Sequence, residues 1–249
     1  MPEGDSIERV RQSLTPFLLG QVIVRAECRW PEVTVRLSGV TCTGLEALGK
    51  HLLILFDDDT LLRVHLGMTG SWHRYDPGER WQRARADLGL SLATAADVLV
   101  CFTVPEVERL TNKERAHHVS LVSLGPDVLK DPFDLTEVLR RARHPQRASM
   151  EVAELLLDQR VAAGIGNIFK CESLFALQIA PHRTVESLDD DTVRALYAAA
   201  SEKMRHSVAH GRSPKRIYGA RVCPVCRGRV SIEEQADRLT WWCPRCQPL

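Results

Sequence analysis

The pattern of apolar and polar positions changes twice along the chain. Residues 6–19 carry an apolar residue every three or four positions and stop at Gly20, which predicts an amphipathic helix. Short apolar runs bounded by turn residues follow, and they predict strands at residues 22–24, 33–35, 52–56, 61–66, 88–92 and 98–102. Because no helical pattern separates these strands, we expect an antiparallel sandwich or barrel.

The second half of the sequence returns to helical spacing. Apolar residues recur every three or four positions, and the predicted helices are residues 135–142, 150–157, 168–177 and 188–208. Ser187 and the acidic residues at 189–191 are expected to cap and begin the last helix. Gly164 and Gly166 between the second and third helices indicate a helix-turn-helix variant.

These patterns predict an α+β protein with an N-terminal helix, an antiparallel β-sandwich and a helical second domain ending in a cysteine-rich hairpin. The expected domains are residues 1–123, 124–213 and 214–249, with a hinge near 211–214. An acidic triplet at 57–59 lies between two predicted strands, so we interpret it as a solvated hairpin tip rather than a metal site.

Composition excludes several classes of protein. With 44% hydrophobic and 26% charged residues over 249 positions, the chain is typical of a globular protein. We find neither a secretory signal nor an apolar run of the roughly 18 residues that a membrane span requires, so we expect a cytoplasmic protein. Four scattered cysteines are expected to be reduced: Cys28, Cys42, Cys101 and Cys171.

Positive charge gathers at the C-terminus, although the net charge of the whole chain is only +1. Residues 212–249 contain eight Lys or Arg against three acidic residues. This excess indicates a polyanionic partner, because phosphate neutralisation is the usual source of affinity for nucleic acids. A solvated surface is the alternative interpretation of the same charges.

The same segment holds two Cys-x-x-Cys pairs separated by 16 residues, which are Cys223, Cys226, Cys243 and Cys246. Four thiolates at this spacing predict one tetrahedral Zn²⁺. Since all four ligands come from the protein, no position is left for water and the zinc is expected to be structural. Between the pairs, Trp241 and Trp242 are interpreted as ribbon core and Arg238 as a nucleic-acid contact.

The N-terminus offers a second kind of chemistry. Removal of Met1 exposes the secondary amine of Pro2, and α-amino groups titrate at roughly 7.7–8.0, close to neutral pH. Such an amine is a nucleophile, with Glu3 beside it as an acid. The alternative is that proline merely permits the removal of methionine and that these residues lead into the first helix.

Several motifs occur together in one order along the chain. They are Pro2-Glu3-Gly4, Gly49-Lys50, residues 65–70 (His-Leu-Gly-Met-Thr-Gly), residues 124–127 (Leu-Gly-Pro-Asp), residues 157–167 and the four cysteines. This set resembles the formamidopyrimidine-DNA glycosylase and endonuclease VIII family over essentially the whole chain. The opening Pro-Glu-Gly-Asp resembles the endonuclease VIII branch, whose usual substrates are oxidised pyrimidines.

The resemblance implies a bifunctional DNA glycosylase and AP lyase of base excision repair. It assigns nucleophilic attack on C1′ to Pro2, protonation of the sugar to Glu3, and phosphate contact with proton transfer to Lys50. It also implies that Asn167 and Arg238 clamp phosphates, with backbone amides after Gly166 adding to the clamp. The implied partner is damaged double-stranded DNA, with single-stranded or bubble DNA left open, and the protein is expected to be monomeric and nucleoid-associated.

Met68 matches the family position that fills the gap left by an extruded base, with Thr69 beside it. Strand core is the alternative interpretation of Met68, and the resemblance favours the wedge.

Two departures from the family pattern keep other functions open. Ser6 stands where the family has a glutamate, and residues 102–110 replace the Arg and Phe motif that reads the opposite strand. The first departure motivates a non-catalytic damaged-DNA-binding protein as an alternative. An 8-oxoguanine or formamidopyrimidine glycosylase is the other alternative, although the second departure favours weak discrimination of the opposite base.

Overall fold

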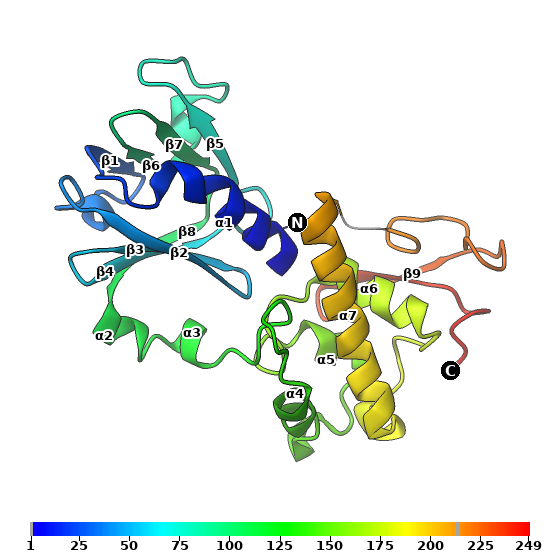
Figure 1. Cartoon of the computed structure of the whole chain (residues 1–249). Coiled ribbons are helices and arrows are strands. Elements are labelled where there is room, and N and C mark those ends of the chain that lie inside the picture. The colour runs from blue at the N-terminus through cyan, green and yellow to red at the C-terminus, as the bar shows by residue number, and fades with distance from the viewer. Residues whose placement is uncertain (1, 213–214) are drawn as a thin grey trace. The chain divides into compact units, whose positions relative to one another are not determined.

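The computed structural model describes residues 2–212 and 215–249, which form two compact units, 1–122 and 123–249 (Figure 1). The first unit begins with helix α1 (Gly4–Leu18). Two four-stranded antiparallel sheets follow, with strand orders β1-β6-β7-β5 and β2-β3-β4-β8. Their strands are β1 (Arg25–Cys28), β2 (Cys42–Leu48), β3 (His51–Phe56), β4 (Thr60–His65), β5 (Ser71–Tyr75), β6 (Leu88–Ala93), β7 (Val98–Phe102) and β8 (Glu106–Thr111).

The core of this unit lies between the two sheets and α1, which confirms the predicted sandwich. Leu52 and Leu62 of one sheet share a buried cluster with Leu92 and Leu99 of the other, and Ile7 of α1 closes it. Alternate residues of each strand therefore face inward, as expected for a sandwich. The short helices α2 (Asn112–Arg115) and α3 (Val119–Val122) end the unit.

Two strand predictions need correction, and three strands were missed. Residues 33–35 are not a strand, because Pro31 begins a 3-10 helix, η1 (Pro31–Thr34). Residues 22–24 are not a strand either, since Val22 makes an isolated bridge with Thr41 and the strand starts at Arg25. Strands β2, β5 and β8 were not predicted, since charged and polar residues at half-buried positions hide their alternation.

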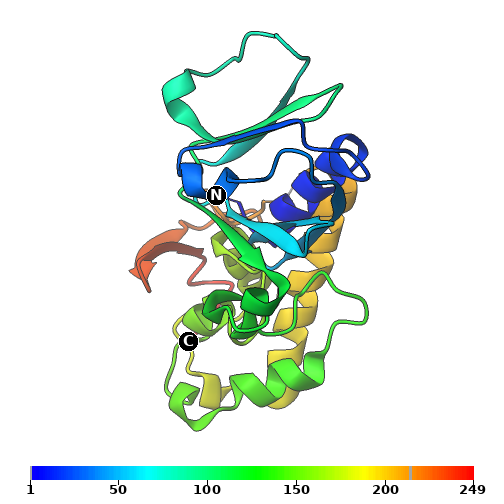
Figure 2. The ribbon, with the colours of Figure 1, turned by 90° about the vertical axis from the view of Figure 1, so that its left-hand side faces the viewer.

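The second unit is helical and ends in a two-stranded hairpin. Its helices are α4 (Leu135–Ala142), α5 (Val152–Leu157), α6 (Asn167–Ala176) and α7 (Asp190–His210), with 3-10 turns η3 (Pro145–Arg147) and η4 (Val185–Ser187). The remaining 3-10 turn, η2 (Arg85–Asp87), precedes β6 in the first unit. Strands β9 (Ser231–Gln235) and β10 (Arg238–Trp242) stand out from the helices in Figure 2.

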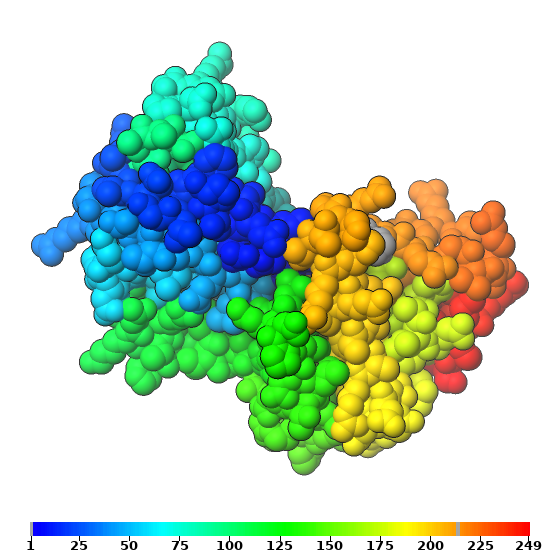
Figure 3. Space-filling model, viewed as in Figure 1, coloured from blue at the N-terminus to red at the C-terminus, as the bar shows by residue number. Residues whose placement is uncertain are grey.

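Helix α7 packs one side into this unit and exposes the other along one face (Figure 3). Asp189, rather than Ser187, caps its start, because the Asp189 side chain accepts a hydrogen bond from the Thr192 amide. Gly211 ends it at φ +72°, a conformation that favours glycine. The predicted boundary at 213–214 falls on residues outside the described ranges. Among the described residues, no helix has both the length and the apolar character needed to cross a membrane.

Candidate nucleic-acid interface and metal centre

Glu3 is the N-cap residue of α1, and Pro2 directly precedes it. The Glu3 carbonyl accepts hydrogen bonds from the amides of Ser6 (2.9 Å) and Ile7 (3.1 Å), which fixes the backbone beside Pro2. Glu3 is only 1% exposed. A buried carboxyl group thus lies one residue from the predicted nucleophile.

The start of α1 also contains a partly buried ion pair that sequence reasoning missed. Asp5 is 2% exposed and accepts a hydrogen bond from Arg9 at 2.7 Å. Ser6 lies between them, because its hydroxyl donates to Asp5 at 3.3 Å and accepts from Arg9 at 3.3 Å. The sequence signal was an acid and an arginine at i and i+4.

Lys50 occupies the turn between β2 and β3, directly after Gly49 at φ +56°. It is half-buried. The turn anchors this lysine at the end of a paired hairpin, since Leu48 and His51 face each other across it.

Met68 and Thr69 lie in the turn between β4 and β5, and the side chain of Met68 is 65% exposed. Strand core is therefore the wrong interpretation of Met68. The Thr103 hydroxyl donates to the Thr69 carbonyl at 2.8 Å, which ties this turn to the loop after β7. Glycine is required at position 67, where the turn packs against Pro105, because a Cβ there would lie 2.6 Å from the ring of Pro105.

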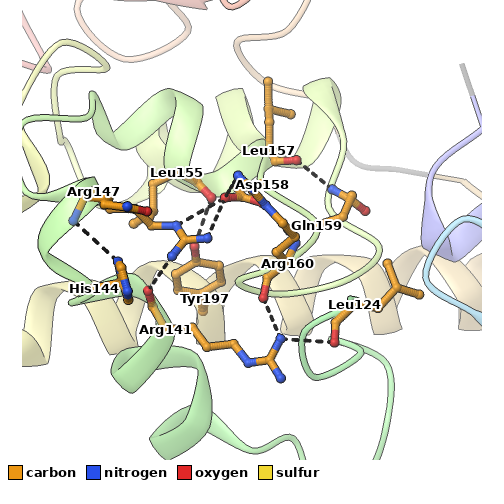
Figure 4. Close-up of polar contacts among 11 residues, drawn as sticks. Leu124, Arg141, His144, Arg147, Leu155, Leu157, Asp158, Gln159, Arg160 and Tyr197 are labelled. Atoms are coloured by element: carbon orange, nitrogen blue, oxygen red, sulfur yellow. Dashed lines mark hydrogen bonds and ion pairs between the residues drawn. The ribbon is translucent and has the colours of Figure 1, made fainter. Parts of the chain in front are cut away.

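In the second unit, the turn before α6 is stabilised by side chains that bond to its backbone (Figure 4). Gln159 accepts a hydrogen bond from the Gly164 amide at 3.0 Å and donates to the carbonyls of Leu157 and Ile165 at 2.8 and 2.9 Å. Gln159 belongs to the motif at residues 157–167, but the sequence predicted no role for its side chain. Its amide reaches both sides of the turn and fixes the approach to α6.

The carboxylate of Asp158, in the same turn, lies 2.9 Å from the guanidinium of Arg147 and 2.9 Å from that of Arg160 (Figure 4). Burial favours a higher pKa for Asp158, but hydrogen bonds from Arg160 and Arg147 outweigh burial, and the pKa is lowered. The carboxylate therefore stays charged at neutral pH and pairs with both arginines.

Asn167 and Arg238, two predicted phosphate contacts, are brought close together in this unit. Gly166 is the N-cap of α6 and Asn167 its first residue. The Asn167 Nδ2 atom donates to the Leu239 carbonyl at 2.7 Å, and Leu239 follows Arg238 in β10. The buried Oδ1 atom of Asn167 has no hydrogen-bond partner within residues 2–212 and 215–249.

A second hydrogen bond attaches α6 to the hairpin. Lys170 is fully buried, and its Nζ atom donates to the Thr240 hydroxyl at 2.7 Å. Sequence reasoning missed this residue, although a lysine within an apolar helix was the available signal. Arg238 itself is exposed and follows a two-residue turn, Ala236-Asp237, with φ of +48° and +56°. The hairpin therefore presents a cation at its tip.

The four predicted zinc ligands come together at the base of the hairpin. Their sulfur atoms all lie within 4.8 Å of one another. The Cys223–Cys246 and Cys226–Cys243 pairs are separated by 3.7 and 3.5 Å. Four thiolates at about 2.3 Å from one tetrahedral zinc lie roughly 3.8 Å apart, so this donor set fits zinc. The centre is structural because four protein sulfurs complete the coordination shell.

Comparison with known proteins agrees with this geometry. Residues 1–103 match the family model "Formamidopyrimidine-DNA glycosylase N-terminal domain", residues 124–218 its "H2TH domain", and residues 222–249 "Zinc finger found in FPG and IleRS". "Probable endonuclease 8 2" of Streptomyces coelicolor is 34% identical and covers 99% of this chain and 94% of its own. "Endonuclease 8" of Pectobacterium atrosepticum is 29% identical over 99% of this chain and 100% of its own.

Among solved structures, formamidopyrimidine-DNA glycosylase of Lactococcus lactis, bound non-covalently to DNA containing an AP site, superposes with a TM-score of 0.87. It is 23% identical and covers 99% of this chain and 100% of its own, so the similarity shows a shared fold. The fold and the four-cysteine centre are those of a zinc-containing DNA repair glycosylase. The chain belongs to the formamidopyrimidine-DNA glycosylase and endonuclease 8 family, and it is a DNA glycosylase of base excision repair.

Proposed function

We propose that this chain is a bifunctional glycosylase and AP lyase that removes oxidised pyrimidines through the amine of Pro2. The placement of Pro2 beside the buried Glu3 at the start of α1 is the observation that carries the proposal. An N-terminal amine is close to its reactive, unprotonated state at neutral pH. The endonuclease 8 names of the relatives support the preference for pyrimidines.

The first step replaces the damaged base by the Pro2 nitrogen. That nitrogen bonds to C1′, and the glycosidic bond breaks as the base leaves and takes up a proton. Glu3 then protonates O4′ while the C1′–O4′ bond breaks, leaving an iminium ion between C1′ and Pro2.

The iminium makes the strand cleavable. It acidifies C2′, and loss of the C2′ proton expels the 3′ phosphate by β-elimination. Loss of a proton from C4′ then expels the 5′ phosphate by δ-elimination, so the strand is cut on both sides of the lost nucleoside.

In the same proposal, Lys50 contacts the phosphate at the lesion and assists proton transfer, whereas Asn167 and Arg238 hold neighbouring phosphates. The hydrogen bond between Asn167 and Leu239 supports this pairing, because it holds the amide close to the hairpin tip. Amides at the start of α6, after Gly166, add donors where the helix dipole favours an anion. One chain acts on one DNA molecule.

Met68 is proposed to fill the space of the extruded base, with Thr69 supporting it. Its exposed fraction of 65% leaves an apolar side chain free to enter a base stack. The hydrogen bond between Thr103 and Thr69 keeps the turn in place.

Ser6 supports a second candidate, a protein that binds damaged DNA without cleaving it. The family's glutamate is missing at this position, and the nearby acid Asp5 is already paired with Arg9. Sodium borohydride with DNA containing an oxidised pyrimidine separates the two candidates. Covalent trapping and strand cleavage support the lyase, whereas salt-sensitive binding without either supports the non-catalytic protein.

Extending this assay to 8-oxoguanine, duplex and single-stranded substrates tests the preferred lesion. Faster release of 8-oxoguanine than of oxidised pyrimidines would contradict the proposed specificity.

A further inference from the structure

The outer face of the sheet formed by β3, β4 and β8 carries three rows of side chains, each crossing all three strands. Register defines the rows, and each contains one residue per strand. In the order β3, β4, β8, they are His51–His65–Glu106, Leu53–Arg63–Glu108 and Leu55–Leu61–Leu110.

The first row lies where three loops leave the sheet. Lys50 immediately precedes His51, the turn with Met68 follows His65, and the loop with Thr103 precedes Glu106. Any displacement of this row therefore moves the loops that carry the proposed catalytic lysine and wedge.

Arg63, in the adjacent second row, connects residues of the first row. It is only 1% exposed, and its guanidinium donates to Nδ1 of His51 at 3.0 Å and to Glu108 at 2.8 Å. A further Nη2 hydrogen bond reaches Glu106. One side chain of β4 thus holds residues of both neighbouring strands, through the fork geometry specific to arginine.

The contact to His51 determines the state of its imidazole. Arginine can only donate hydrogen bonds, so Nδ1 of His51 must accept and the proton of the neutral ring lies on Nε2. Burial and, to a smaller extent, the charges of Arg63, His65, His118 and Lys50 together lower the pKa of His51 to about 3. His65, with its ring centroid 5.1 Å away, also has a lowered pKa, mainly through burial.

Two carboxylates of β8 and one histidine after that strand lie around Arg63 and His51. Glu106 and Glu108 pair with Arg63, and Nε2 of His118 lies 3.0 Å from Glu108. Burial favours a raised pKa for Glu108, but hydrogen bonding to Arg63 outweighs it and the pKa is lowered. Glu108 therefore remains charged at neutral pH.

Stability alone gives a poor reason for this arrangement. Arg63 is buried although its partners Glu106 and Glu108 are 44% and 38% exposed, and an ion pair that desolvates a charge is often no more stabilising than well-packed apolar residues of similar size. Apolar packing of this kind occurs in the third row of the same sheet face, where Leu61 packs in a cluster with Leu53 and Leu121. The charged residues instead lie where the loops leave the sheet, and their directional hydrogen bonds fix the positions of the strand ends there.

We propose that Arg63 is a positioning residue, which fixes the roots of the Lys50, Met68 and Thr103 loops and holds His51 as its neutral Nε2–H tautomer. Arg63 contacts no DNA in this role. The inference rests on the proposed glycosylase function of those loops.

The test compares Arg63→Gln with Arg109→Gln in the full-length, zinc-loaded protein. Arg109 is the matched control, because it ties Asp58 and Thr60 at the opposite end of the same sheet. The histidines are titrated by ¹⁵N NMR without DNA. The rate of single-turnover cleavage and the affinity for DNA are each measured from pH 5 to 8.5.

In the wild type and in Arg109→Gln, His51 should stay neutral and protonated on Nε2 down to pH 5. In Arg63→Gln, His51 should titrate nearer its ordinary value of about 6.5. Cleavage should slow by roughly 10- to 100-fold, the effect of a small misplacement of catalytic groups, and gain an acid inflection while DNA affinity changes by less than about threefold.

Glu106→Gln provides a second variant if Arg63→Gln fails to fold, since Glu106 is 44% exposed and its loss leaves Arg63 paired to Glu108. We expect an intermediate slowing of about threefold in the same direction. An unchanged pH profile and an unchanged His51 tautomer in the folded variant would overturn the proposal. If wild-type protein fails to cleave, the function proposed above fails, and the NMR titration still judges Arg63.

Discussion

The two units hold their proposed site residues in different ways. In the first unit, Lys50 and Met68 lie on turns that leave a hydrophobic sandwich with an ionic network on its outer face. In the second, Arg238 lies on a short hairpin held by hydrogen bonds to α6 and by four cysteines. This difference predicts that chemistry and DNA affinity depend on separable features of the chain.

Blocking the N-terminus should have the largest effect and should act on chemistry alone. A residue retained before Pro2 converts the nucleophilic amine into an amide, so borohydride trapping should fall at least ~100-fold. Binding to DNA with an uncleavable abasic analogue should change little. An equal extension after Leu249 is the control, and trapping retained with a verified N-terminal block would refute the role of Pro2.

Zinc removal should have the opposite signature. The zinc and its four thiolates hold the base of the hairpin. Loss of the zinc should therefore weaken DNA binding roughly 10- to 100-fold through lost contacts to charged groups. The zinc-free protein should retain the far-ultraviolet circular dichroism of its helices. Unchanged affinity in protein shown by mass spectrometry to lack zinc would contradict the structural role of the metal. Zinc binding should also weaken as pH falls, because protons compete for the thiolates.

Arg238→Ala should reproduce the binding part of that effect without unfolding the hairpin. The exposed side chain leaves no cavity, and loss of a charge-assisted hydrogen bond of about 1.5–3 kcal/mol lowers affinity roughly 10- to 100-fold. The slope of log affinity against log salt should fall by about one. Arg194→Ala on α7, whose arginine pairs with Asp191, is the control and should leave the slope unchanged.

Acid should destabilise the first unit through His51. The pKa of His51 is lowered to about 3 in the folded chain, so below its ordinary value of roughly 6.5 the unfolded chain binds more protons. The contribution of His51 to stability is therefore fully present above pH 6.5 and is lost as pH falls toward 3. Urea unfolding from pH 7 to 4 should show this decline, and His51→Phe should reduce it.

His117→Ala, at an exposed position near the same network, is the control for this measurement. The same decline in His51→Phe as in wild type would show that another group causes it.

Met68→Ala should have the smallest effect. Since Met68 is 65% exposed, its loss should leave the melting temperature within about 2 °C, as expected for a surface substitution. Cleavage of duplex DNA should slow by roughly two- to fivefold, about 0.4–1 kcal/mol, because less apolar surface enters the stack. Single-stranded DNA, which has no stack to refill, should be cleaved at the wild-type rate.

Much of the fold follows from local sequence patterns. The helix at 135–142 and the strand at 98–102 match their predicted limits, since apolar periodicity and turn residues define both. The pattern at 33–35 predicted a strand because it alternates apolar residues, but Pro31 at the start of η1 determined the outcome. Local propensity decides such short segments only when no neighbour overrides it.

The candidate site was predictable to the extent that its residues lie in short motifs. The four cysteines are an example, and their clustering confirms the predicted zinc centre. Arg63 was not predictable, because its partners Glu106 and Glu108 are 43 and 45 positions away and only strand register brings them together. Lys170 could have been noticed as a lysine within an apolar helix, but its partner could not be predicted for the same reason, since Thr240 is 70 positions away.

Mapping the atom that becomes covalently attached tests the central claim most directly. The mature protein is incubated with DNA containing an oxidised pyrimidine and borohydride, digested, and analysed by tandem mass spectrometry. We predict a mature chain that begins at Pro2 and a single reduced deoxyribose adduct on the Pro2 nitrogen. An adduct on Lys50 or another lysine, or a retained Met1 on the trapped protein, would contradict the account.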